Sequence, residues 1–546
     1  MAKKRRKLKD MQGQTTLSVS MVDETPNDNM TFPYGLFRGV KHYLDFVGVL
    51  KFVRKLKKET KNAPRLDLIL VALITYTLHC DNSMDACSKW LEDPKVRNII
   101  GFRTTDNISQ KTIDRAVGRL GQCRERILEK LWKGITDRFE IDDYDVAVDG
   151  SAVVLYGPKS NMGALGHPRD GRPGDLQVEF TVAVLVQLGI PVYVRPFRGN
   201  ASDEEQYREA IPEIVSLIEG KNIGALEEYK QRALELGSLV TLAKVGMTII
   251  ADNGAASKEN IDRTVKLGAD MITRTKLNMS DEQRIRDDIL DFEYIPDTDV
   301  LCYKHVFRSS GRTNYLYYSN ELYHASLNRA VNSIKRGLKE YMDLRDNGIR
   351  KSKVVKIRNI IGVDVECTIE LRDIDLKEFD EEGIIRMARE RIGTRAGFFK
   401  LTSTTELDPK DALLRYRRRA LVEQTISSLK RISGIKPLRV WSDDSIEGSM
   451  ILALLSEAVL AMMRYCIGKR YRQLDRRSGS KKESYLPSTK RMAWELGHLT
   501  LTRFRNGKGM SDANLSNWTD LTKAVFEDIH LHESPNWGSK MISATS

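Results

Sequence analysis

Closely spaced cysteines are absent from this chain. Its six cysteines are scattered over 546 residues, at Cys80, Cys87, Cys123, Cys302, Cys367 and Cys466. No two of them lie two to four residues apart, as the ligands of a structural zinc site do. Their density is also far below that of a disulfide-stabilised secreted scaffold. The pattern argues against both classes and favours a reducing cytoplasm.

An apolar run long enough to span a bilayer is also lacking. The longest apolar stretches lie around 68–78 and 450–463, and they are too short or contain Glu457. The basic N-terminus is not followed by the apolar segment of a secretory signal. We therefore expect a cytoplasmic protein with no membrane partner.

Positive charge is in clear excess. The chain has 88 Lys and Arg residues against 75 Asp and Glu residues, which gives a formal net charge of +13. The excess is clustered at 3–9, 51–61, 415–419 and 469–482. Clustered positive charge favours a polyanionic partner, and nucleic acid is the leading candidate. Any one block, taken alone, is equally well explained as a solvated surface.

The length and the 41% apolar content allow two to four domains. Residues 1–31 are polar with a basic head, which indicates a disordered tail. Residues 32–139 show the apolar spacing of helices, with Ser83 and Ser109 as expected N-caps. This helical domain is consistent with contact to DNA through a helix-turn-helix, or with a structural or dimerising role.

After Asp145 the pattern changes to β-rich strands and intervening helices, which predicts an α/β core. Strands are expected at 146–148, 177–186, 190–197, 247–251 and 271–273, and helical segments between 211 and 244.

A strand-rich stretch then interrupts this core. Its strands are expected at 300–307, 314–318, 366–371 and 397–401, and a helix at 325–344. Because the stretch separates two parts of one core, we interpret it as an inserted subdomain. The expected organisation is a core at 140–291 and 407–467, an insertion at 292–406, and a basic linker with a C-terminal segment at 468–546.

Two aspartates follow short strands of the predicted core. Asp149 comes after Val146 to Val148, and Asp252 comes after Met247 to Ala251. A carboxylate just past a buried strand is held rigidly at a sheet edge, where it can reach a substrate. Either residue, taken alone, could equally be a turn or capping aspartate. Asp142, Asp143 and Asp145 are alternatives to Asp149, but they precede the strand.

The stretch 411–430 predicts one helix with a charged face. At about 100° per residue, Tyr416, Arg419, Glu423 and Lys430 lie within roughly 60° of one another. Their face offers one carboxylate flanked by a phenol, a guanidinium and an ammonium. The opposite face is apolar, with Leu414, Leu421, Leu429 and Ile432, and is expected to pack on the core. By periodicity alone, a solvated helix with ordinary salt bridges is an equal alternative.

The spacing Tyr416-x2-Arg419-x3-Glu423-x6-Lys430 resembles the Tyr-Arg-Glu-Lys signature of insertion-sequence transposases of the fourth group. That group belongs to the Asp-Asp-Glu superfamily and has a ribonuclease H-like fold. Further segments resemble the family's motifs in the expected order, at 166–173, 197–203, 249–257 and 435–439. The first of these departs modestly in its glycine spacing, at Gly171 and Gly174.

The resemblance implies an α/β fold with a ribonuclease H-like catalytic core, a strand-rich insertion and an N-terminal helical domain. It implies that Asp149, Asp252 and Glu423 are the catalytic residues and the metal ligands, with Asp149 bridging two Mg²⁺ ions, for which Mn²⁺ can substitute. In the family, water first cleaves at the element's end, and the freed 3′-hydroxyl then attacks target DNA.

The resemblance also implies the partners. The expected DNA contacts are Tyr416, Arg419, Lys430, Arg415, Lys436 and Arg439. The expected substrates are the element's terminal inverted repeats and target DNA, which place the protein in the cytoplasm and on the nucleoid. Cutting two ends in concert requires two active sites, so we expect a homodimer on DNA, with 510–529 as a candidate contact.

Two other functions use the same residues. A ribonuclease H-like nuclease would hydrolyse DNA without strand transfer and needs the same three carboxylates, and only the Tyr-Arg-Glu-Lys signature argues against it. A transposase-derived DNA-binding protein without catalysis would be favoured by loss of a carboxylate, and none is lost.

Overall fold

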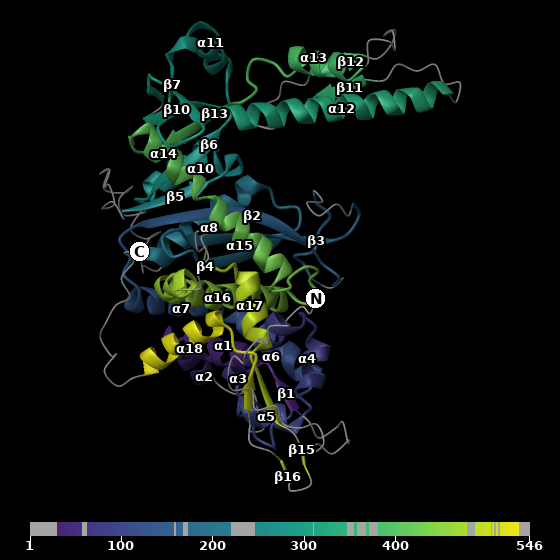
Figure 1. The fold of residues 1–546 in the computed structure, drawn as a ribbon, viewed down its shortest axis with the longest axis vertical. Helices are drawn as coiled ribbons and strands as arrows, with labels where there is room; N and C mark the ends of the chain where they lie inside the picture. Colours follow the sequence, from purple (N-terminus) through teal and green to yellow (C-terminus); the bar gives the residue numbers. More distant parts are fainter. Residues whose placement is uncertain are drawn as a thin grey trace, which may run out of the picture.

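The computed structural model describes most of the chain (Figure 1). The described residues are 30–56, 63–157, 160–166, 173–219, 246–309, 311–346, 354–357, 367–370, 380–477, 486–503, 505–506, 509–510 and 514–533. The polar tail expected at 1–31 lies almost entirely outside them, as do most of the helical segments expected after residue 219.

A mixed sheet of ten described strands runs through the middle of the molecule. Its order is β4-β3-β2-β5-β6-β13-β10-β8-β7, and β9 pairs with β10. The strands are β2 (Tyr144–Val154), β3 (Gln177–Leu185), β4 (Ile190–Arg198), β5 (Met247–Ala251), β6 (Asp270–Thr275), β7 (Phe292–Tyr294), β8 (Val300–Tyr303), β9 (Phe307–Ser309), β10 (Arg312–Ser319) and β13 (Phe398–Ser403). β2, β5 and β6 are parallel, and the other pairs are antiparallel. The fold is therefore mixed α/β.

The centre of this sheet is covered on both faces. All nine residues of β3 are buried, which a strand can achieve only if both of its faces are packed. Helices α8 (Asp203–Glu219), α15 (Ala420–Arg431) and α16 (Asp443–Arg477) contact β3 or β4. This double cover explains why β4 and β5 are mostly apolar, and why Gln177, Glu179 and Thr181 of β3 are buried along with its apolar residues.

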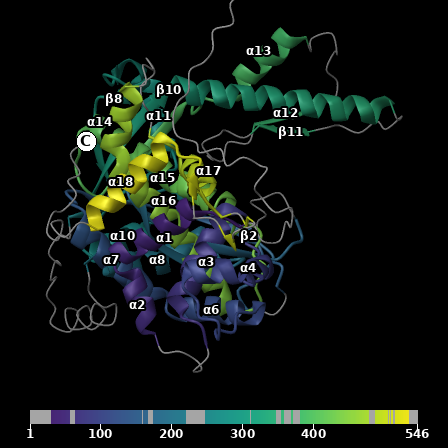
Figure 2. The ribbon, with the colours of Figure 1, turned by 60° about the horizontal axis from the view of Figure 1, so that its bottom comes forward.

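The strands of the stretch 292–406 extend the core sheet, because β13 pairs with β6 of the core. The rest of the stretch forms a projecting arm (Figures 1 and 2). The arm contains α12 (Asn320–Asp346), α13 (Glu381–Arg391) and the hairpin of β11 (Val354–Ile357) with β12 (Cys367–Glu370). It has a small core of its own, formed by Leu327, Ala330, Ile334, Leu338, Ile384 and Ala388. α11 (Met279–Asp287) lies between β6 and β7 in the chain.

The N-terminal part is helical, as its periodicity predicts. Its helices are α1 (Tyr34–Phe46), α2 (Val49–Lys55), α3 (Leu66–His79), α4 (Met84–Trp90), α5 (Pro94–Ile100), α6 (Gln110–Gln122) and α7 (Arg124–Arg138). Both expected N-caps are confirmed: the Ser83 side chain accepts from the Ala86 amide, and the Ser109 side chain accepts from the Thr112 amide.

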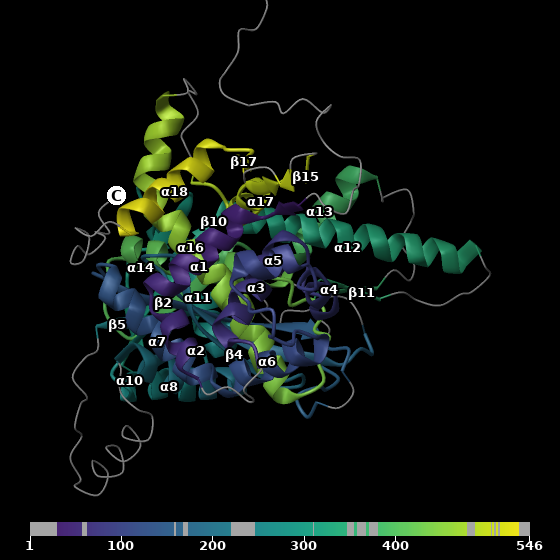
Figure 3. The same cartoon turned by 90° about the horizontal axis from the view of Figure 1, so that it is seen from below.

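The C-terminal elements pack on this helical part. α16 crosses α6 so closely that Gly121 and Gly448 have no room for a Cβ atom. The strand β1 (Met30–Phe32) pairs with β14 (Thr500–Arg503), which also pairs with β17 (Asn514–Ser516). α17 (Thr489–His498) and α18 (Asp520–Glu533) contact α1 (Figure 3).

The expectation that 510–529 contacts a second copy has to be revised for α18. Its apolar residues Leu521, Val525 and Ile529 are buried within the same chain. The Tyr43 hydroxyl donates to Asp528 at 2.5 Å, which fixes α18 on α1. An apolar helix face that is already covered cannot drive dimerisation.

Helix α16 is apolar and packs between the sheet and the N-terminal helices. Its segment 443–468 is long and apolar enough to cross a membrane by length and composition, but 78% of the apolar window is buried in the protein. Its position is that of a core helix. It carries Glu457, which is 4% exposed and accepts a hydrogen bond from Ser428 of α15.

Burial raises the pKa of Glu457 to about 7. The unfolded chain ionises near pH 4.5, so between pH 4.5 and 7 the folded state keeps a proton that the unfolded state has lost. This difference lowers the free energy of unfolding as the pH rises through that window, by on the order of 3 kcal/mol at pH 8.

We therefore expect Glu457→Gln to stabilise the protein more at pH 8 than at pH 5. Gln keeps an acceptor for Ser428 and has no charge to bury. Urea unfolding of both proteins at the two pH values measures the effect, with the exposed Glu406→Gln as the control. An equal change in stability at both pH values would refute the assignment.

Candidate active site

Asp149 is expected from the sequence just past the end of a strand, but in the structure it lies inside β2. The antiparallel partner β3 prolongs the strand, so Asp149 pairs with Val182. The parallel ladder with β5 stops one residue earlier, at Val148 and Ala251. Asp149 therefore lies where the sheet opens between β2 and the end of β5. Its Oδ1 accepts from the Gly150 amide at 2.8 Å.

Asp252 follows β5 directly, as predicted. It precedes a short 3₁₀ helix (Asn253–Ala255), but its side chain makes no capping hydrogen bond. The capping alternative for this residue is therefore excluded. Because β2 and β5 are parallel neighbours, the positions following their shared ladder, Asp149 and Asp252, meet at one edge of the sheet.

The signature stretch forms two helices instead of the single helix expected. α14 (Pro409–Arg417) ends before Arg418, and α15 begins at Ala420. The junction is tightened by bonds between residues three apart, including the Arg419 amide to the Tyr416 carbonyl at 3.0 Å. The junction changes the buried face: Leu414, expected in the core, is 41% exposed, whereas Tyr416 and Val422 are buried.

Three carboxylates converge on the guanidinium of Arg419. Its Nη1 lies 3.2 Å from Oδ2 of Asp149 and 3.5 Å from Oδ2 of Asp252. Its Nη2 donates to Oε1 of Glu423. The three acidic side chains come from β2, from the end of β5 and from the first turn of α15, and one cation joins them.

The electrostatics of this cluster differ between its members. Burial, helped by the negative charges of Asp252 and Glu423, raises the pKa of Asp149 to about 6, although Arg419 and the Gly150 amide oppose the shift. The Tyr416 hydroxyl lies 3.4 Å from Oδ1 of Asp252, and burial and that carboxylate raise the pKa of Tyr416 well above its usual range. Tyr416 is therefore a neutral hydrogen-bond donor in the site.

The other expected DNA contacts are spread out. The Lys430 ammonium lies over the ring of Phe180, 6.0 Å from its centroid. The Arg415 Nε lies 2.8 Å from Oδ2 of the buried Asp145. Lys436 is exposed in the loop after α15. The geometry thus brings Tyr416 and Arg419 to the carboxylates and leaves Lys430, Arg415 and Lys436 at a distance along the chain.

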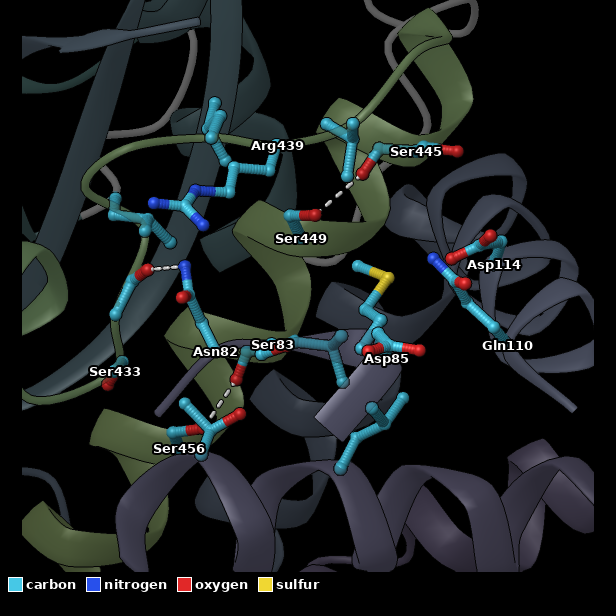
Figure 4. Close-up of a pocket in the computed structure, with 18 of the residues that line it drawn as sticks. Asn82, Ser83, Asp85, Gln110, Asp114, Ser433, Arg439, Ser445, Ser449 and Ser456 are labelled. Carbon is cyan, nitrogen blue, oxygen red and sulfur yellow. Dashed lines mark hydrogen bonds between the residues drawn. The ribbon is translucent and has the colours of Figure 1, made fainter. Parts of the chain in front are cut away.

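Arg439 lines a different cavity, with a volume of about 560 Å³. Figure 4 shows it between the start of α4, the start of α6, the loop after α15, and α16. Asn82 donates to the Gly434 carbonyl across it, and Ser449 donates to the Ser445 carbonyl. None of the three carboxylates lines this cavity.

Arg274 is a residue of the site that the sequence analysis did not identify. It lies on β6, the next parallel strand after β5, and it interacts electrostatically with Tyr416, Asp252 and Arg419. Its guanidinium lies over the ring of Phe399, and its buried Nε and Nη2 have no hydrogen-bond partner among the described residues. Asp252 was identified because it follows a short buried strand of the core. The same criterion, applied to the next parallel strand, would have pointed to Arg274.

The donor chemistry of the cluster fits a hard divalent cation. Carboxylate oxygens are the ligands that Mg²⁺ and Mn²⁺ prefer. As arranged, no group of three or more His, Cys, Asp or Glu side chains in the described part of the chain is close enough to hold a metal ion. The three carboxylates surround a guanidinium instead. The motif expected at 166–173, with His167 and Arg172, lies mostly outside the described residues.

The Arg415–Asp145 pair gives a test of structural against DNA-binding roles. Asp145 is 1% exposed, and burial and Asp143 raise its pKa to about 6, so it is ionised at pH 8. We expect Arg415→Met to lower the free energy of unfolding at pH 8 by about 1–3 kcal/mol, because a buried carboxylate loses its partner while Arg418 remains 3.9 Å away.

A double-mutant cycle with Asp145→Asn measures the coupling in urea unfolding. The double variant should regain most of the stability lost in Arg415→Met. Additive losses would show that the pair contributes nothing and that the guanidinium is available to DNA.

Comparison with known proteins identifies a family for the segment that contains this site. A family model described as a transposase DDE domain matches residues 146–456, which contain all three carboxylates. A solved structure, a piggyBac transposase synaptic complex with hairpin DNA, is 9% identical, with a TM-score of 0.36 over 92% of this chain and 82% of that one, so the two are only distantly alike. No curated protein matches the chain. Because the family model covers more than half of the sequence, the chain belongs to the DDE-domain transposases.

Proposed function

We propose that this protein is a DNA transposase that cleaves at the ends of its element and joins the freed 3′-hydroxyl to target DNA. The observation that carries the proposal is the convergence of Asp149, Asp252 and Glu423 on one point, from three separate elements, inside the segment that matches the family. Three carboxylates gathered at one point repel one another unless a cation lies among them, which fits a site that takes divalent metal.

Membership of the fourth group of insertion-sequence transposases is the finer part of the proposal. The undeviating Tyr416-x2-Arg419-x3-Glu423-x6-Lys430 spacing supports it. The half of the sheet ordered β4-β3-β2-β5-β6, with three antiparallel strands and two parallel additions, supports a ribonuclease H-like core. In this assignment 32–139 is the helical DNA-binding or dimerisation domain and 292–406 is the insertion.

Asp149, Asp252 and Glu423 would hold the Mg²⁺ or Mn²⁺ ions, and the family resemblance assigns the shared position to Asp149. Two such ions supply activation of the attacking oxygen and stabilisation of the leaving oxygen in an in-line displacement at phosphorus. The chain's own residues orient the DNA. Tyr416 donates a hydrogen bond as a neutral phenol, and Arg419 presents a planar pair of N–H donors that matches a phosphate.

The proposed DNA track continues from the site along the chain. Lys430, Lys436 and Arg439 add positive charge after Glu423, on α15 and the following loop. Arg415 belongs to the same proposed set, but it would have to leave Asp145 to reach a phosphate. Terminal inverted repeats and target DNA are the proposed ligands. Concerted cutting of two ends requires two such sites, which supports a homodimer on DNA.

The decisive measurement compares cleavage and joining by the wild type and Glu423→Gln. The substrate is a labelled duplex carrying the element's terminal repeat, in Mg²⁺ or Mn²⁺ at fixed salt. Wild type should release a 3′-hydroxyl end and join it to target DNA. Glu423→Gln should bind the duplex and reduce both reactions by at least about a hundredfold, because it removes one carboxylate ligand.

Glu406→Gln is the matched control. Glu406 is an exposed glutamate paired with Arg308 on the surface, so the same substitution there should leave both reactions unchanged. Nicking without joining would favour the nuclease alternative. Binding without cleavage by the wild type would favour a DNA-binding protein without catalysis.

A further inference from the structure

Arg419 makes contact with more carboxylates than a structural ion pair requires. One guanidinium can satisfy one carboxylate with two parallel hydrogen bonds, yet here it is divided among three. Its distances to Asp149 and Asp252, 3.2 and 3.5 Å, are longer than those of a good charge-assisted bond. Glu423 is its closest partner, and its contacts to Asp149 and Asp252 are the looser ones.

The surroundings of Arg419 would allow it to exchange partners. The side chains of Asp252 and Glu423 are 43% and 52% exposed, so the cluster opens to solvent on one side. Arg419 lies at the junction between α14 and α15, where its amide and its carbonyl are both bonded in turns, so an exchange of partners would move the side chain alone. A side chain at such a junction can reorient without disrupting a helix.

The charge balance also favours exchange. Arg274 adds a second guanidinium beside the same site, its buried Nε and Nη2 have no hydrogen-bond partner among the described residues, and its charge opposes that of Arg419. An incoming phosphate would bring negative charge to two guanidiniums that repel each other. It would also supply Arg419 with the planar, bidentate acceptor that its fork fits best.

We propose that Arg419 is an exchangeable counter-ion: without DNA it occupies the space between Asp149, Asp252 and Glu423, and with DNA it moves to a phosphate and frees the carboxylates for divalent metal. The inference rests on the proposed function, because it concerns the same site. Its consequence is that DNA and metal bind cooperatively, and that the protein without DNA holds metal weakly. A transposase of this design would assemble its metal site only on a nucleic acid.

The test measures Mn²⁺ binding to the full chain without DNA. Electron paramagnetic resonance detects the free Mn²⁺ at each step of the titration. Arg419→Met removes the competing guanidinium and should tighten Mn²⁺ binding by about tenfold, within the range of ordinary coupling between linked sites. Arg417→Met is the matched control: among the described residues Arg417 pairs with the exposed Asp299, at 2.6 Å, and this variant should bind Mn²⁺ as the wild type does. Asp149→Asn identifies which Mn²⁺ ions belong to the carboxylates.

The second part of the experiment repeats the titration with the terminal-repeat duplex present. Two backgrounds are subtracted: Mn²⁺ bound by the duplex alone, and Mn²⁺ bound by the duplex together with the Asp149→Asn variant. Wild type should gain Mn²⁺ affinity on adding DNA, whereas Arg419→Met should gain little, because its carboxylates are already free. Arg419→Lys, which keeps a charge but cannot span three carboxylates, should lie between them. Melting curves with and without Mn²⁺ show whether each variant is folded, since metal that binds the native state raises its stability.

The inference is overturned if Arg419→Met, folded by its melting curve, binds Mn²⁺ no more tightly than the wild type. It is also overturned if DNA leaves the wild-type affinity unchanged. Either result is compatible with DNA cleavage that depends on Glu423, in which case the proposed function stands and only the exchange fails. If the Mn²⁺ titrations give the expected results but the wild type does not cleave the duplex, the proposed function is rejected instead.

Discussion

The parallel pairing of β2 with β5 is the constraint on which the site depends. It stops at Val148 and Ala251, and the two residues that follow are Asp149 and Asp252. Like charges at adjacent strand ends repel unless a cation compensates them, and burial makes that compensation more important for Asp149 than for its exposed neighbour. The sheet thus fixes two carboxylates in place, and the remaining elements of the site supply the side chains that interact with them.

The helices α14 and α15, with their junction, contribute one cation, Arg419, and one further carboxylate, Glu423. Their junction at Arg418 and Arg419 directs Arg419 toward the sheet and places Glu423 in the first turn of α15, where the helix dipole favours a negative charge. Tyr416 closes the floor of the site as a buried phenol. The sequence motif therefore corresponds to two helices that share one target.

The sequence was sufficient for elements with local signals. β4 and β5 agree with their expected ranges to within a residue, because continuous apolar runs bounded by turns leave little choice. The extent of β2 was not predictable in the same way, since it depends on the partner β3, about thirty residues later in the chain. The break after Arg417 has no glycine or proline to announce it. The three carboxylates of the candidate site came from a resemblance, whereas Arg274, which no motif contains, had to come from the geometry.

The strand pair β1 and β14 joins the first described strand to one near the end of the chain, with Met30 opposite Arg503. A ribosome releases the first of these residues long before the second, so the N-terminal helices wait for their last strand, and for α18, until translation is nearly complete. During that interval β1 lacks its strand partner, and the surface of α1 that α17 and α18 later cover is exposed. The native contacts of β1 and of α18 can therefore form only after residues 503 and 533, respectively, have been synthesised.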